Sequence, residues 1–156
     1  MNDQSVREVI AKLLDWEDAH AGFDAAVAGV PEEYRGKRAG AHSPWELLEH
    51  MRLAQHDILD FSRNSDYHEM EWPKDYWPES PAPPSAAAWD ASVAAFHRDR
   101  EALKQMALDT SLDLMQKIPH GTGQTYLRQL VLTADHSAYH VGQLVLVRKL
   151  LGIWKS

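Results

Sequence analysis

The sequence predicts an all-α protein, an up-and-down four-helix bundle with long connections after its second and third helices. Four stretches carry apolar residues at the three- and four-residue steps of a helix, and a proline-rich segment at residues 64–84 interrupts them. The chain has 156 residues, of which 44% are hydrophobic, and this is enough to bury a core. We therefore expect one helical domain over residues 1–156.

The first helix is predicted over residues 3–29, where apolar residues recur at helical steps until Pro31 ends the pattern. Three polar residues fall inside this apolar stripe: Glu17, His20 and Asp24. Polar side chains that face a core need partners. Two interpretations are open: His20 hydrogen-bonds Asp24 or another helix at the edge of the core, or the three residues line a polar pocket.

The start of the second helix is marked by a capping box, with Ser43 as N-cap, Pro44 at the first helical position and Glu46 three residues after the cap. Its apolar seam consists of Leu47, Met51, Ala54, Ile58 and Phe61. His50 lies about 60° from the middle of this seam, and Asp57 lies two turns further along nearly the same line. His50 can therefore face the bundle.

Residues 64–84 form a long connection that contains five of the eight prolines. Four large aromatic residues lie within it: Tyr67, Trp72, Tyr76 and Trp77. Such side chains gain stability by packing, so we expect an ordered segment. It is either a strap over one end of the bundle or the wall or lid of a pocket.

The third helix is predicted from a cap at Ser85 to about Asp109, and a crossing loop with a brief extended piece follows it. The fourth helix is predicted over residues 124–151 and is apolar on more than one side. A helix of this kind is covered on both sides. A neighbouring helix or a second subunit can provide the cover, so the sequence favours a homodimer.

The fourth helix contains His136 and His140, whose four-residue spacing places both imidazoles on one helix face at metal-ligand geometry. The same spacing also arises by chance in a chain with nine histidines. Ser137 follows His136, so the glutamate of the zinc-protease motif is missing. If His50 converges with this pair, the three imidazoles form an open site of the catalytic type.

Three segments resemble the DinB/YfiT-like superfamily of four-helix bundles, which includes metal-dependent proteins of bacteria. They are SPWELLEHMRLAQHDIL (43–59), DYWPESPAPPSAAAWDASVAAF (75–96) and ADHSAYHVGQLVLVRKLLG (134–152). The resemblance implies a divalent ion, zinc or nickel, held by one histidine of the second helix and two histidines four apart on the fourth. These positions match His50, His136 and His140.

The activity that the resemblance implies is less specific, because the fold and metal site are shared by proteins with different reactions. Some relatives transfer a low-molecular-weight thiol such as bacillithiol, and others are mycothiol-dependent isomerases or hydrolases. We expect a thiol transferase in which Glu17, His20, Asp57 or Tyr139 handles a proton or orients a ligand imidazole. The alternatives are a metal-dependent hydrolase, and a non-enzymatic bundle with a structural metal or a small-ligand-binding role.

Charge and composition limit the partners. The net charge is −7, with acidic residues spread along the chain, so no basic surface is available for nucleic acid. The N-terminal segment lacks the pattern of a signal peptide, and no stretch of 18 residues is free of charge. With no cysteine in the chain, we expect a cytoplasmic protein that acts on a small molecule, away from membranes.

Overall fold

The computed structural model describes residues 4–155, and in this range it contains five α-helices and no strand. The helices are α1 (Gln4–Leu13), α2 (Phe23–Val27), α3 (Pro44–Arg63), α4 (Ala86–Leu108) and α5 (Tyr126–Leu150). Two short 3-10 helices, η1 (Glu32–Tyr34) and η2 (Lys74–Tyr76), lie in the connections. Residue 3, the predicted first residue of the first helix, lies outside the described range.

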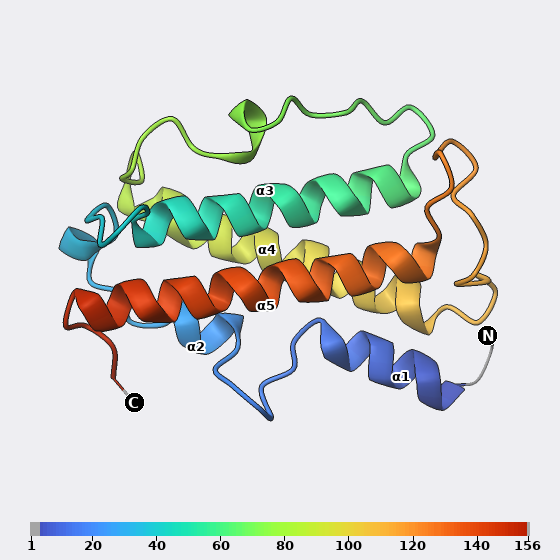
Figure 1. Ribbon diagram of the computed structural model, residues 1–156, viewed down its shortest axis with the longest axis horizontal. Coiled ribbons are helices and arrows are strands. Elements are labelled where there is room, and N and C mark those ends of the chain that lie inside the picture. Colours follow the sequence, from blue (N-terminus) through green and yellow to red (C-terminus); the bar gives the residue numbers. More distant parts are fainter. Residues whose placement is uncertain (1–3, 156) are drawn as a thin grey trace.

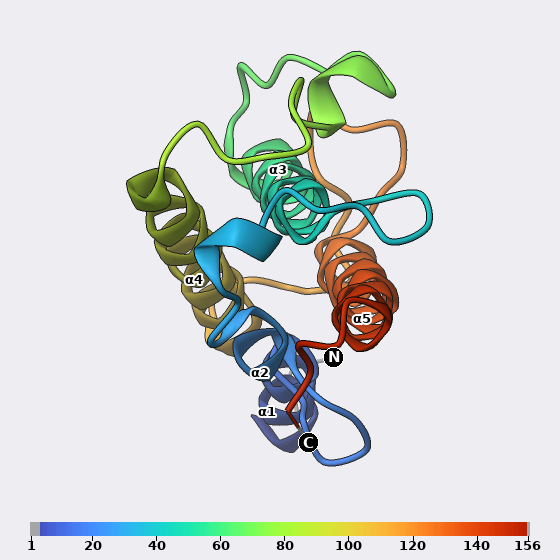
Figure 2. The ribbon, with the colours of Figure 1, turned by 90° about the vertical axis from the view of Figure 1, so that its left-hand side faces the viewer.

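The helices form a bundle in which α3, α4, α5 and the α1–α2 pair occupy four corners (Figure 2). The predicted all-α bundle with long connections is confirmed. The order of helix directions is not the simple up-and-down one that we predicted. Figure 1 shows that α3 and α4 run in the same direction, because the segment between them returns along the whole length of the bundle. This return path places the segment over α3.

The predicted helix over residues 3–29 is interrupted, because residues 14–22 leave the helix between α1 and α2. Local hydrogen bonds stabilise the break, since Trp16 Nε1 and Lys12 Nζ both donate to Asp18 Oδ2, at 2.6 Å and 2.9 Å. Apolar residues of α1 and α2 are buried in the core on both sides of the break. The apolar periodicity of the sequence therefore continues through residues 14–22, although the helix does not.

The capping box at the start of α3 is confirmed. Ser43 Oγ accepts a hydrogen bond from the Glu46 backbone N–H at 3.1 Å, and Glu46 Oε2 accepts one from the Ser43 N–H at 2.7 Å. Pro44 occupies the first helical position, as expected. The fixed start sets the rotation of α3 and buries His50, which is 2% exposed.

Two buried arginines donate hydrogen bonds to backbone carbonyls at the C-terminal ends of α4 and α2. Arg7 of α1 donates to the carbonyl of Ala107 at 2.9 Å and to that of Leu112 at 2.6 Å, beyond the end of α4. Arg148 of α5 donates to the carbonyl of Ala26 in α2 at 2.7 Å. A guanidinium satisfies carbonyls that have no partner within a helix. These contacts hold the α1–α2 pair against α4 and α5.

Helix α5 is buried on two sides and exposes large apolar side chains on a third. These exposed residues follow one another at steps of four or seven positions: Leu132, Tyr139, Leu146 and Leu150. This is the side that a second subunit would cover, and the homodimer stays a prediction. Within residues 4–155, none of the helices is long and apolar enough to span a membrane.

Candidate metal centre

His50 of α3 meets His136 and His140 of α5 between two antiparallel helices. His50 Nε2 lies 3.1 Å from His140 Nε2 and 3.1 Å from His136 Nε2. The ligand nitrogens of all three lie within 4.8 Å of one another. In the described part of the chain, this is the one group of three or more His, Cys, Asp or Glu side chains close enough to hold an ion.

Hydrogen bonds on the outer side of the cluster fix which nitrogens carry protons. His50 Nδ1 lies 2.8 Å from the carbonyl oxygen of Tyr76, which only accepts, so Nδ1 donates. His140 Nδ1 lies 2.7 Å from Gln143 Oε1 and donates in the same way. In neutral imidazoles, both Nε2 atoms are then lone-pair acceptors that face each other at 3.1 Å. A cation between them satisfies both.

The donor set fits a divalent ion that prefers nitrogen. Burial, together with the smaller effect of the neighbouring imidazoles, lowers the pKa of His136 and of His140 to about 4. Burial also lowers the pKa of His50. All three rings are therefore neutral at pH 7, as metal ligands must be. With metal–nitrogen bonds of about 2.0–2.1 Å, two ligands of a tetrahedral site lie about 3.3 Å apart, close to the observed spacing.

The segment over residues 64–84 forms a wall of the cluster. The Trp77 ring stacks on the His50 ring, with centroids 3.9 Å apart and an angle of 3° between the planes. His42 stacks on Trp77 in turn, at 4.4 Å and 12°. Of the two sequence interpretations, the pocket wall therefore describes this segment. No local sequence motif connects His42 to His50, because the link between them is the Trp77 ring of a distant segment.

Asp57 anchors this wall to α3 and does not belong to the histidine cluster. Its two carboxylate oxygens accept hydrogen bonds from the hydroxyls of Tyr67 and Tyr76, each at 2.7 Å. Burial raises the pKa of both tyrosines, and the Asp57 carboxylate raises it further. Because the Tyr76 carbonyl accepts from His50, the anchor also fixes the orientation of that imidazole.

Tyr139 lies at the outer edge of the cluster and is 65% exposed. Its ring meets His140 edge-on, with centroids 4.9 Å apart. Its hydroxyl accepts a hydrogen bond from Gln143 Nε2 at 3.2 Å. Gln143 thus links Tyr139 to His140, and no sequence motif singles out this glutamine.

Glu17 and His20 lie away from the cluster, in the loop between α1 and α2. His20 lines a cavity together with Ala134 and Ala138 of α5. Each of these alanines is two positions from a cluster histidine, so they face nearly the opposite side of the helix. We had assigned both polar residues to a continuous first helix, and its interruption places them on the other side of α5.

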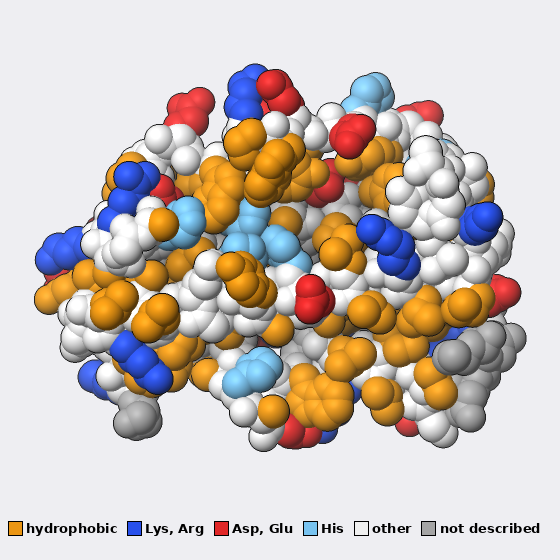
Figure 3. Space-filling model, in the orientation of Figure 1, with side chains coloured by type: hydrophobic (Ala, Val, Ile, Leu, Met, Phe, Trp, Pro, Cys, Tyr) orange, Lys and Arg blue, Asp and Glu red, His pale blue; other side chains and the backbone are white. Residues whose placement is uncertain are grey.

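The histidine cluster is open to solvent on one face of the molecule. Figure 3 shows histidine side chains at the bottom of a hollow in the middle of this face. Apolar side chains border the hollow above and below, where Figure 1 shows the 64–84 segment and α5. A small molecule can therefore reach the cluster without a change in the bundle.

Together, the fold and the cluster define a class of helical bundles that can hold a metal ion between two antiparallel helices. The family model of the DinB superfamily matches residues 15–144, which is most of the chain. The chain belongs to the DinB superfamily. Comparison with curated proteins and with solved structures finds no match.

Proposed function

We propose that the protein is a divalent-metal-dependent enzyme, with zinc or nickel held by His50, His136 and His140, and that it transfers a low-molecular-weight thiol to an electrophile. The observation that carries the proposal is the convergence of Nε2 lone pairs at 3.1 Å in a hollow open to solvent. Imidazole ligands suit zinc and nickel, whereas magnesium and calcium prefer oxygen. Three protein ligands leave a position for a substrate.

A divalent ion held there would supply a Lewis acid that lowers the pKa of a thiol or of water. The protein's own contribution is orientation. The Tyr76 carbonyl and the Gln143 amide hold the Nδ1 protons of His50 and His140, so both Nε2 atoms stay available as ligands. Trp77, stacked on His50, keeps water from one side of the site.

Tyr139 is the candidate proton donor. Its hydroxyl oxygen accepts from Gln143, so its own proton remains for another acceptor. The side chain is exposed at the edge of the hollow, where it can reach a substrate beside His140. It can therefore protonate the leaving group of an electrophile after the thiolate attacks.

The cluster itself favours a thiol over water as the nucleophile. It contains no carboxylate, and both oxygens of Asp57 already accept hydrogen bonds from tyrosines. A hydrolase of this type places a general base beside its water. A thiol, with an ordinary pKa of about 8.5, ionises near neutral pH with much less assistance. A hydrolase with the same three ligands is the second candidate.

The test starts from protein purified without a histidine tag, whose metal content is measured by mass spectrometry. We expect close to one zinc or nickel ion per chain. Native protein and His50→Ala are then assayed with a panel of low-molecular-weight thiols and 1-chloro-2,4-dinitrobenzene. We expect thiol-dependent turnover that the substitution abolishes. Equal turnover by the two proteins would reject the proposal.

A parallel assay with p-nitrophenyl acetate and no thiol separates the two candidates. Hydrolysis that depends on His50, without any thiol transfer, would favour the hydrolase. A protein that binds the ion and catalyses neither reaction would support the non-enzymatic alternative, a bundle with a structural metal or a bound small ligand.

A further inference from the structure

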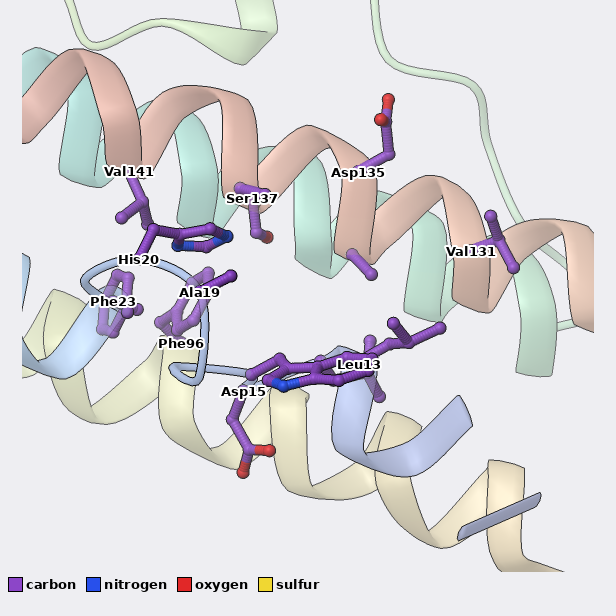
Figure 4. Close-up of a pocket in the computed structure, with 15 residues that line it drawn as sticks. Leu13, Asp15, Ala19, His20, Phe23, Phe96, Val131, Asp135, Ser137 and Val141 are labelled. Atoms are coloured by element: carbon purple, nitrogen blue, oxygen red, sulfur yellow. The ribbon is translucent and has the colours of Figure 1, made fainter. Parts of the chain in front are cut away.

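A second cavity lies on the side of α5 that faces away from the histidine cluster. Its volume is about 420 Å³, within the range of small-molecule sites. Figure 4 shows it between α5, the loop that joins α1 to α2, and α4. Most of its lining is apolar, including Leu14, Phe23, Phe96 and Val141.

The cavity exists because the interruption of the first helix lies opposite small side chains. Ala134, Ser137 and Ala138 of α5 line the cavity, and the chain between residues 14 and 22 forms its outer wall. A continuous helix would bring large side chains against these small ones, as in other parts of a close-packed bundle. The loop leaves the space unfilled.

Two polar side chains, Ser137 and His20, face each other across one end of the cavity. Ser137 is 9% exposed, and its hydroxyl has no hydrogen-bond partner among residues 4–155. His20 Nδ1 lies 2.9 Å from the carbonyl of Ala21 and donates to it, so that in the neutral ring Nε2 is an acceptor. Figure 4 shows the two side chains pointing toward one another from opposite walls. One group placed between them can bond to both.

Asp15 and Asp135 are part of the cavity lining, but their carboxylates point out of it. Figure 4 shows the side chains of Asp15 and Asp135 directed away from the space. Asp15 also accepts a hydrogen bond from Lys104 at 2.6 Å. The cavity therefore offers no charge partner to an ion, and an ionic ligand would lose its hydration without compensation.

Aromatic rings form two walls of the cavity. Phe23 and Phe96 stack with centroids 3.7 Å apart and an angle of 12° between their planes, and Trp16 lines the space as well. The Trp16 indole N–H is already bonded to Asp18, so the ring presents an apolar surface. Flat apolar surfaces of this kind favour a planar aromatic ligand.

We propose that this cavity binds a small, uncharged aromatic molecule that carries one hydroxyl group. The ring lies among Phe23, Phe96 and Trp16, the ligand hydroxyl donates to His20 Nε2, and Ser137 Oγ donates to the ligand oxygen. The histidine cluster takes no part in this binding, since the two sites lie on opposite sides of α5. The site is independent of the proposed transferase.

The test uses 2-naphthol and its isostere 2-methylnaphthalene, in which a methyl group replaces the hydroxyl. Binding to His50→Ala protein is followed by calorimetry and by amide NMR shifts, so that a phenol on the metal centre does not contribute. We expect 2-naphthol to bind about tenfold more tightly than 2-methylnaphthalene, with shifts at Ala134 and Val141. Equal affinities, or shifts confined to α3, would overturn the proposal.

Two substitutions complete the design. Ser137→Ala removes the hydroxyl without filling the cavity. It should lower the affinity for 2-naphthol several-fold and leave the affinity for 2-methylnaphthalene unchanged. Ala138→Leu fills the cavity and should abolish binding of both ligands. The matched control is Ala87→Leu, the same change at an exposed position of α4. If Ala138→Leu does not fold, Ser137→Ala alone decides. An unchanged affinity for 2-naphthol in Ser137→Ala contradicts the assigned hydrogen bond.

Discussion

The two sides of α5 are buried in different ways. The side toward α3 carries His136 and His140, and hydrogen bonds from the wall segment and from Gln143 orient the cluster. The side toward α1 and α2 carries Ala134, Ser137 and Ala138 and leaves a cavity of about 420 Å³. The directions of hydrogen bonds specify the first side, and the size and shape of the side chains mainly specify the second. Substitutions on the first side should change metal affinity, and substitutions on the second should change packing and leave metal affinity unchanged.

The largest expected effect comes from His136→Ala, which removes one of three ligands. We expect the affinity for zinc or nickel to fall by more than about 100-fold. This exceeds the loss expected when only a hydrogen-bond partner of a metal ligand is removed. The helical content should survive, because His136 belongs to neither buried apolar cluster. Competition with a chelating dye measures the affinity, and far-UV circular dichroism measures the fold.

Ser137→Ala is the matched control for this prediction, since Ser137 is the next residue and faces the cavity on the other side. We expect it to keep native metal affinity. Native affinity in His136→Ala would remove this residue from the ligand set. Loss of the helical signal together with the metal would instead show that the ion is structural.

A smaller loss is expected from Gln143→Leu, which removes the acceptor of the His140 Nδ1 proton. Without that partner the imidazole is free to rotate or change tautomer, so metal affinity should fall by about 10- to 100-fold. Gln143→Glu keeps an acceptor at the same place and should retain at least native affinity. Dye competition measures both variants, and equal losses in the two would show that the hydrogen bond does not orient His140.

Asp57→Asn tests the anchor of the wall segment. The carboxylate accepts from two tyrosine hydroxyls, and a neutral amide oxygen replaces only part of that interaction. We expect the free energy of unfolding in urea to fall by about 1–2 kcal/mol. Amide hydrogen exchange in residues 64–84 should accelerate more than exchange in α4. Uniform acceleration over the bundle would contradict a local anchoring role.

The same anchor predicts a dependence on pH. Burial raises the pKa of Tyr67 and Tyr76 in the folded protein, so the folded state binds their protons more tightly than the unfolded state. The contribution of the two tyrosines to the free energy of unfolding is complete below their unfolded-state pKa of about 10. It is lost as pH rises above that value. The unfolding free energy of the native protein should therefore fall more steeply above pH 10 than that of a Tyr67→Phe, Tyr76→Phe double variant. Parallel curves would contradict the assignment.

The features that the sequence predicted correctly are those encoded by neighbouring residues. The capping box of Ser43 and Glu46 joins two residues three positions apart, and it fixed both the start of α3 and the inward direction of His50. The pairing of His136 and His140 follows from one turn of helix. The prediction that His50 of α3 meets the two histidines of α5 rested on the family resemblance, because no local pattern relates residues so far apart in the sequence.

The features that the sequence did not predict depend on contacts between distant segments. Nothing near Asp57 shows that Tyr67 and Tyr76 return to it from the wall segment. The break after α1 was missed for a different reason. Gly22, which precedes α2, was available as a signal, but the apolar pattern on both sides outweighed it. That error moved Glu17 and His20 to the wrong side of α5.

The smallest expected effect tests the cavity side of the comparison. Ala134→Leu places a larger apolar side chain where the structure leaves space, so the free energy of unfolding should rise by about 1 kcal/mol. Ala107→Leu makes the same change at a site that is 0% exposed and lines none of the described cavities, and overpacking there should cost about 1–3 kcal/mol. Urea unfolding measures both variants. If the two substitutions destabilise the protein equally, the space beside α5 is not available to a side chain or to a ligand of similar size.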